Sequence, residues 1–246
     1  MCLNGDDNET VNGSAYAEFL KAHPEYESTK ALDALRACEY GRLDAQRDVY
    51  LDYTGAGLHA ESQIRQHVEL LNSAVFGNPH SASPTSSGMT RLVEQARQAV
   101  LAWFNAGRDY TAVFTQNATA ALKHVGESYP FARGGSLLLT ADNHNSVNGI
   151  REFACAEGAS VAYAPLTTPE LRIDRERLRE LLARADPSAK NLFAYPAQSN
   201  FSGVTHPLEL VDEAHAAGWD VLLDAAAYVP TKRLDLSAVK PEFVAE

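Results

Sequence analysis

Short apolar runs alternate with longer stretches of helical periodicity through the second half of the chain. The apolar runs predict strands, and the stretches between them predict helices. The strands are expected at 112–115, 136–140, 161–164, 191–195 and 220–224, and the helices at 119–129, 147–156, 175–184 and 207–217. Strands that alternate with helices of ten or more residues are typical of βαβ units. The pattern therefore predicts an α/β fold, with a mostly parallel sheet and helices on both faces.

The first half of the chain is less regular. Residues 1–15 are polar and acidic and predict a disordered leader, and residues 16–49 have helical periodicity. A short strand is expected at 49–52, followed by helices at 61–71 and 91–104. Residues 50–246 are expected to form one large domain. A last apolar run at 243–245 looks like the beginning of a strand, so we expect this domain to be incomplete at its C-terminus.

Composition and charge narrow the classes of function. The net charge of −11 opposes binding to nucleic acid or to anionic membrane surfaces. The apolar stretches are far shorter than the roughly 18 residues that a membrane span needs. Cys2, Cys38 and Cys155 are an odd number without CxxC spacing, so neither a disulfide framework nor a zinc site is indicated. We therefore expect a cytoplasmic protein.

One expected strand, at 220–224, ends on a carboxylate. Asp224 follows a run of apolar residues, and an unpaired buried carboxylate is costly unless it is protonated or meets a cation. Ligands of open α/β sheets bind beyond the carboxyl ends of the strands. A protonated pyridine nitrogen is one cation that would suit this position.

Three other strand ends carry residues that suit the same kind of ligand. At 117–119 a strand turns into a helix, where backbone N–H groups and the hydroxyl of Thr119 could bind a phosphate, although an ordinary helix cap explains the residues equally well. His144 could stack on a flat cofactor or shuttle a proton, or simply bond within its loop. Asn200 could donate to a phenolate-type oxygen or occupy a polar turn. Together they describe a pocket for a flat, phosphorylated pyridine.

Six short motifs in order give the chain a family resemblance. They lie at 51–56, 76–81, 117–119, 143–147, 200–203 and 224–226. In sequence and spacing they resemble the class V aminotransferase group of pyridoxal-phosphate (PLP) enzymes, which have fold type I. Within that group they are most similar to the N-terminal domain of molybdenum cofactor sulfurases and to the related cysteine desulfurases.

The resemblance implies roles for individual residues. Ala118 and Thr119 would hold the phosphate of PLP, and His144 would stack on the pyridine ring. Asn200 would contact the ring hydroxyl, and Asp224, with Ala226 beside it, would pair with the ring nitrogen. The substrate side would be formed by Gly55, Ala56 and Asn78. The family further implies an amino-acid substrate, transfer of sulfur from L-cysteine and a homodimer of the full-length protein.

Two departures from the family keep other functions open. Ala227 stands where many desulfurases have glutamine, and no lysine matches the one that forms the Schiff base, which the family places just after the strand beginning at 243. The chain by itself could be a catalytically silent fragment or pseudoenzyme. An aminotransferase or lyase acting on another amino acid is a further alternative. A metal hydrolase using Asp52, His144 and Asp224 has no supporting ligand spacing.

Overall fold

The computed structural model describes residues 6–53 and 55–246, which form two compact units. One unit consists of the chain up to Leu51 together with Leu58–Val75, and the other of Asp52–Gly57 together with Phe76–Glu246. Among the described residues, none of the helices combines the length and the apolar character that crossing a bilayer requires.

The first unit is entirely helical. Its elements are α1 (Asp6–Ala22), the 3-10 helix η1 (Pro24–Thr29), α2 (Lys30–Glu39), α3 (Arg42–Gln46) and α4 (Glu61–Ser73). Helix α1 begins inside the segment that we expected to be a disordered leader, while residues 1–5 of that segment lie outside the described residues.

The boundary between the units also differs from the predicted one. Helix α4, which we expected within the large domain, packs with the N-terminal helices: the backbone N–H of Ser62 donates to Glu39 at 2.8 Å, and Arg42 donates to the carbonyl of His59 at 2.5 Å. These bonds satisfy backbone polar groups at the start of α4. Local periodicity could not assign this helix to either unit.

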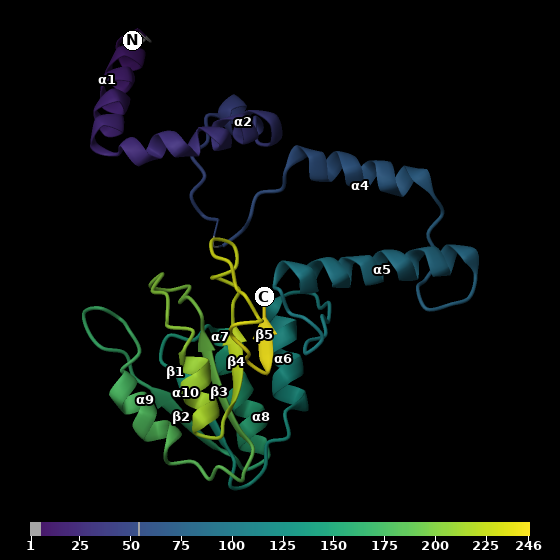
Figure 1. Cartoon of the computed structure of the whole chain (residues 1–246), viewed down its shortest axis with the longest axis vertical. Coiled ribbons are helices and arrows are strands. Elements are labelled where there is room, and N and C mark those ends of the chain that lie inside the picture. Colours follow the sequence, from purple (N-terminus) through teal and green to yellow (C-terminus); the bar gives the residue numbers. More distant parts are fainter. Residues whose placement is uncertain (1–5, 54) are drawn as a thin grey trace. The chain divides into compact units, whose positions relative to one another are not determined.

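The second unit is built on a five-stranded parallel sheet (Figure 1). Its strands are β1 (Ser136–Thr140), β2 (Ser160–Ala164), β3 (Asn191–Pro196), β4 (Asp220–Asp224) and β5 (Phe243–Ala245), in the spatial order β2-β1-β3-β4-β5. All four pairings are parallel, as the alternating pattern predicted. The carboxyl ends of β1, β3 and β4 therefore lie at one edge of the sheet.

Helices cover both faces of this sheet and complete two cores. Alternate strand residues enter opposite clusters: Leu138 and Phe193 pack with α9 and α10, and Leu139 and Leu192 pack with α6 and α8. The helices are α5 (Pro84–Trp103), α6 (Ala118–Ser128), α7 (Asn145–Asn148), α8 (Ile150–Ala156), α9 (Arg175–Leu182) and α10 (Leu210–Ala216). The predicted fold class, a parallel α/β sheet with helices on both faces, is confirmed.

Three helical predictions needed adjustment. Helix α5 begins at Pro84, several residues before the expected start, because Ser83 caps it by accepting a hydrogen bond from the Ser86 N–H. The single helix expected at 147–156 is divided at Gly149 into α7 and α8, since glycine is the residue after proline that helices tolerate least. Helix α10 begins at Leu210, three residues after the predicted start.

Two predicted strands do not form. Residues 112–115 pair with no strand among the described residues, and Val113 and Phe114 are 71% and 52% exposed. Instead, Arg97 donates to the carbonyl of Ala112 and lies over the Phe114 ring. Residues 49–52 likewise form no strand in the described structure, and Leu51 is 84% exposed. An apolar run is not sufficient to form a strand, because its backbone N–H and C=O groups also need a neighbouring strand to bond with.

Candidate cofactor site

A cavity of about 320 Å³ opens at the carboxyl ends of β3 and β4, beside the start of α6. It brings together seven of the residues predicted for the site, namely Gly55, Ala118, Thr119, His144, Asn200, Asp224 and Ala226. Two predicted substrate-side residues, Ala56 and Asn78, line neither this cavity nor the neighbouring one described below. The sheet therefore gathers motifs that are more than a hundred residues apart in the chain.

Asp224 forms the buried acidic end of the cavity. It is the last residue of β4 and is 7% exposed, and its carboxylate accepts a hydrogen bond from the backbone N–H of Ala226 at 3.2 Å. Burial raises its pKa, and the Ala226 N–H and the nearby His144 oppose this shift only in part. The position therefore favours a cation brought in by a ligand.

The first turn of α6 forms another side of the cavity. Asn117 caps this helix by accepting from the Ala120 N–H at 2.9 Å, which leaves the N–H groups of Ala118 and Thr119 outside the helical hydrogen-bond ladder. The Thr119 hydroxyl lies 2.7 Å from that of Ser146. The cap and the anion-binding geometry, which we treated as alternatives, are thus compatible.

His144 lies on the loop after β1. Its Nδ1 atom accepts from the backbone N–H of Ser146 at 3.2 Å and caps the short helix α7. Since Nδ1 is an acceptor there, the neutral ring carries its proton on Nε2. The imidazole is exposed and borders both cavities, so it can contact a ligand in either one.

Asn200 lies at the tip of a tight hairpin that follows β3. The hairpin is closed by a bridge between Gln198 and Thr205 and by a bond from the Ser199 N–H to the Val204 carbonyl at 2.9 Å. Gly203 completes the turn with a φ of +73°, a conformation that favours glycine. The hairpin presents Asn200 to the cavity.

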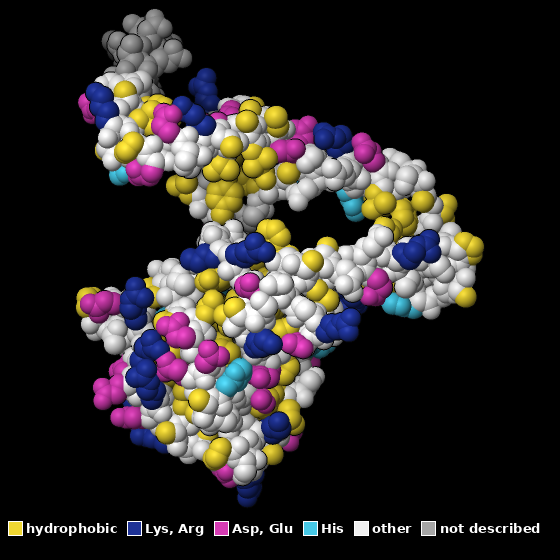
Figure 2. Space-filling view, in the orientation of Figure 1, with side chains coloured by type: hydrophobic (Ala, Val, Ile, Leu, Met, Phe, Trp, Pro, Cys, Tyr) yellow, Lys and Arg dark blue, Asp and Glu magenta, His cyan; other side chains and the backbone are white. Residues whose placement is uncertain are grey.

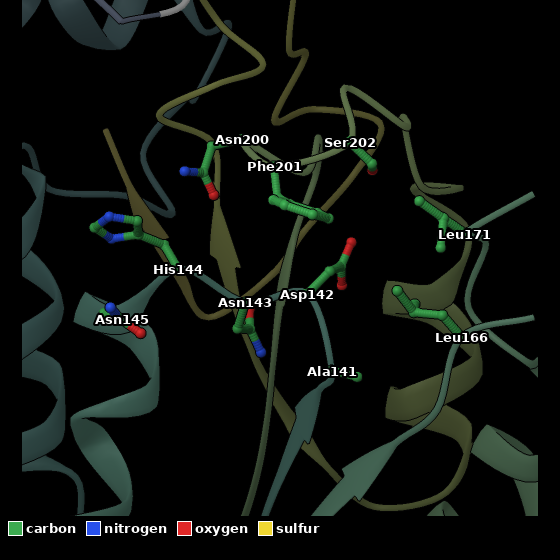
Figure 3. Close-up of a pocket in the computed structure, with 10 residues that line it drawn as sticks. All are labelled: Ala141, Asp142, Asn143, His144, Asn145, Leu166, Leu171, Asn200, Phe201 and Ser202. Atoms are coloured by element: carbon green, nitrogen blue, oxygen red, sulfur yellow. The ribbon is translucent and has the colours of Figure 1, made fainter.

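A second cavity, of about 370 Å³, adjoins the first and shares His144 and Asn200 with it (Figure 3). Leu166, Leu171 and Phe201 give it apolar walls, while Asp142 points into the space between them (Figure 3). The carboxylate of Asp142 is bonded to the ring of His206 at 2.7 Å. Sequence reasoning missed this acid–histidine pair, because the two residues are far apart in the chain.

Three more residues at the site were not predicted. Gln198 and Ser146 line the first cavity, and Lys232 donates to the Gln198 side chain at 2.5 Å. Gln198 lies only two residues before Asn200 and Ser146 two after His144, so the short polar strand-end segments were the available signal. No local signal pointed to Lys232, because only the folding of the loop after β4 brings this residue to the site. Within the described part of the chain, no group of three or more His, Cys, Asp or Glu is placed to hold a metal ion.

Comparison with known proteins places this site in a family. The family model described as aminotransferase class-V matches residues 49–245, which include all the cavity residues. The chain belongs to this family. The members most similar in sequence include molybdenum cofactor sulfurases: that of Homo sapiens is 39% identical over 230 residues, and that of Arabidopsis thaliana is 37% identical over 265. These matches cover 87% and 92% of the chain but only 25% and 32% of the relatives.

Solved structures agree with the family. The cysteine desulfurase CsdA of Escherichia coli is 25% identical with a TM-score of 0.67, over 86% of this chain and 53% of its own. A C-DES mutant with glycine covalently linked to its PLP cofactor is 21% identical with a TM-score of 0.67, over 85% of this chain and 54% of its own. The chain therefore has the fold of PLP enzymes and spans about half of those structures and a third or less of the curated relatives.

Proposed function

We propose that this chain carries the PLP-binding site of an enzyme that removes sulfur from L-cysteine, as a molybdenum cofactor sulfurase or cysteine desulfurase does. The observation that carries the proposal is the buried carboxylate of Asp224, whose pKa is raised because burial is not balanced by a cation. The protonated ring nitrogen of PLP would supply that cation. The surrounding groups match the other parts of the same molecule.

The phosphate would bind at the start of α6. The N–H groups of Ala118 and Thr119 and the positive end of the helix dipole favour an anion there. The paired hydroxyls of Thr119 and Ser146 would add two donors. These groups would hold the phosphate at the start of α6, in the same cavity as Asp224.

The ring would lie between His144 and the end of β4. His144 would stack on one face, with its orientation fixed by the Ser146 N–H, and Asn200 would donate to the ring hydroxyl. Ala226, beside Asp224, leaves room for the ring edge. When bound, PLP withdraws electrons from the α-carbon of an amino acid, provided that its ring nitrogen stays protonated. Holding that proton is the task of Asp224.

We further propose that the lysine attached to PLP lies outside residues 1–246. No lysine is among the residues that line the cavity, and Lys240 is paired with Asp109 at 3.2 Å. Lys232 touches the site only through Gln198. The substrate side, including Gly55, Ala56 and Asn78, would be completed in a homodimer of the full-length protein. We propose a cytoplasmic location and no nucleic-acid or membrane partner, in line with the net charge.

Borohydride reduction of the full-length protein tests the proposal. We expect PLP to give a visible absorbance band that reduction fixes to one lysine, and we expect L-cysteine to release sulfur in a PLP-dependent way. Peptide mapping should place that lysine outside this chain, and Lys232→Met should keep the band. Absence of PLP binding by the full-length protein would reject the proposal. Labelling of Lys232 would reject only the assignment of the lysine.

A second candidate is a member of the same family that lacks sulfur chemistry. The fold and the cofactor site do not fix the reaction, and Ala227 replaces a glutamine that many desulfurases carry. Incubation of the PLP-loaded protein with a panel of amino acids distinguishes the two. Turnover of another amino acid with none of L-cysteine would favour an aminotransferase or lyase, and no turnover at all would favour a pseudoenzyme.

A further inference from the structure

Two buried side chains beside the cofactor cavity form a pair that the proposed chemistry does not use. His206 Nε2 lies 2.7 Å from Asp142 Oδ2, and the side chains are 0% and 2% exposed. Burial by itself would raise the pKa of Asp142, but the hydrogen bond with His206 holds that pKa below its ordinary value. The carboxylate therefore depends on its histidine partner.

The pair joins two segments that carry proposed cofactor contacts. Asp142 lies two residues before His144, on the loop that leaves β1. His206 closes the base of the hairpin that carries Asn200, where its backbone N–H donates to the Ala197 carbonyl at 3.0 Å. A shift of either segment would thus be passed to the other through this contact.

Among the described side chains, no other hydrogen bond joins this loop to the hairpin. Asn143 anchors the same loop by donating to the Ala194 carbonyl at 2.9 Å, but that residue belongs to β3 and not to the hairpin. Asn148 donates to the Asn143 carbonyl and so acts within the loop. Without the Asp142–His206 bond, the tip with Asn200 would be held to the His144 loop only indirectly.

We propose that Asp142 and His206 are positioning residues, which hold His144 and Asn200 at the spacing that lets both contact one cofactor ring. This inference rests on the proposed PLP site. Neither Asp142 nor His206 lines the cavity in which the ring would bind. Its effect is to prevent the hairpin and the loop from moving apart, which would leave the ring stacked on His144 but without the Asn200 contact, or the reverse.

The opposite end of the sheet offers a matched control. There the hydroxyl of the buried Tyr129 is a hydrogen-bond donor that lies 2.8 Å from Asp220 Oδ2 and 2.9 Å from the Asn191 carbonyl. Like the Asp142–His206 pair, it links separate segments through a buried side chain. It lies at the amino ends of the strands, away from the cavity. Tyr129→Phe should therefore lower stability without altering the site.

The test uses the full-length protein and compares His206→Ala, His206→Gln and Asp142→Asn with Tyr129→Phe. PLP affinity is measured by titration, ring orientation by the visible circular dichroism of the bound cofactor, and stability by thermal unfolding. We expect His206→Ala and Asp142→Asn to weaken PLP binding by about ten-fold, the size of one hydrogen bond to a charged group. Both should also alter the dichroism. His206→Gln keeps a donor for Asp142 and should restore much of the affinity.

Each outcome decides the inference. If the His206 and Asp142 variants lose only thermal stability, as expected for Tyr129→Phe, the positioning role is wrong. If His206→Ala does not fold, His206→Gln decides: wild-type dichroism supports the inference, and an altered signal despite the retained donor contradicts it. The proposed function is judged separately on the wild-type protein: it fails if that protein does not bind PLP or does not release sulfur from L-cysteine.

Discussion

Strand β4 carries an aspartate at each end, and the two have opposite surroundings. Asp220 at the start accepts from the Tyr129 hydroxyl at 2.8 Å, lies 3.8 Å from the Lys190 ammonium and has a side chain that is 33% exposed. Asp224 at the end is 7% exposed and accepts only from a backbone N–H, that of Ala226. Helix α6 passes both, since its first turn borders the Asp224 cavity and Tyr129 follows its last residue.

The difference shows what separates a structural acid from a candidate functional one. At the amino end the protein provides the donors itself, so the charge of Asp220 is satisfied without a ligand. At the carboxyl end, no cation of the protein offsets the burial of Asp224 in full. Burial disfavours the charged carboxylate, and its pKa is therefore raised. Such costs concentrate at functional sites, where a bound molecule removes them.

The sharpest contrast is expected from replacing each aspartate with asparagine. Asp224→Asn removes the counter-charge of the PLP ring nitrogen and should lower turnover on the order of 10²-fold or more, a size typical of removing one electrostatic group from an active site. Asp220→Asn should leave turnover near the wild-type value. Steady-state kinetics of the two full-length variants measure this, and equal effects on turnover would contradict the comparison.

A smaller effect is expected at His144. His144→Ala removes the stacking group and should weaken PLP retention by roughly 2- to 10-fold, the size of one aromatic stacking contact, and slow turnover with it. His124→Ala is the matched control, because His124 is exposed on α6 outside the cavity. Equilibrium dialysis of PLP measures retention. Wild-type retention and turnover in His144→Ala would show that the ring does not stack there.

A change at the amino end of β4 should alter the stability of the protein and not its function. Tyr129→Phe removes the hydroxyl that binds Asp220 and Asn191 and should cost about 1–3 kcal/mol in the free energy of unfolding, because buried acceptors lose their donor. Denaturant unfolding measures the loss. The PLP titration of this variant should overlay that of the wild type, and a clear loss of affinity would mean that the two ends of β4 are coupled.

The smallest effect concerns the cofactor-free protein. The folded-state pKa of Asp224 is raised, so its ionisation disfavours folding: the contribution is most favourable below the unfolded pKa and is lost as pH rises through the folded pKa. Asp224→Asn should therefore stabilise the PLP-free protein near neutral pH, by about 1 kcal/mol. Thermal unfolding as a function of pH should show this gain shrinking in acid. A destabilised variant at neutral pH would mean that a protein cation already pairs with Asp224.

Much of the second unit could be predicted from local patterns. The bounds of β1 and β4 agree with their apolar runs, and β2 and β3 differ by one residue each, because buried parallel strands are continuous apolar segments flanked by turns. The runs at 49–52 and 112–115 misled, since they too are apolar but belong to no strand of the described structure. Periodicity indicates which secondary structure a segment favours, but not whether a neighbouring strand is present to pair with it.

The sequence by itself determined the fold class, the family and the residue types after three strands and at the start of α6, including Asp224 and His144, because these depend on short segments and their order. Only the tertiary structure decided which strand ends meet, that Ala56 and Asn78 line neither cavity, and that Asp142 is paired with His206. Those facts depend on contacts between residues far apart in the chain. Such contacts arise from packing around the sheet, which no local pattern encodes.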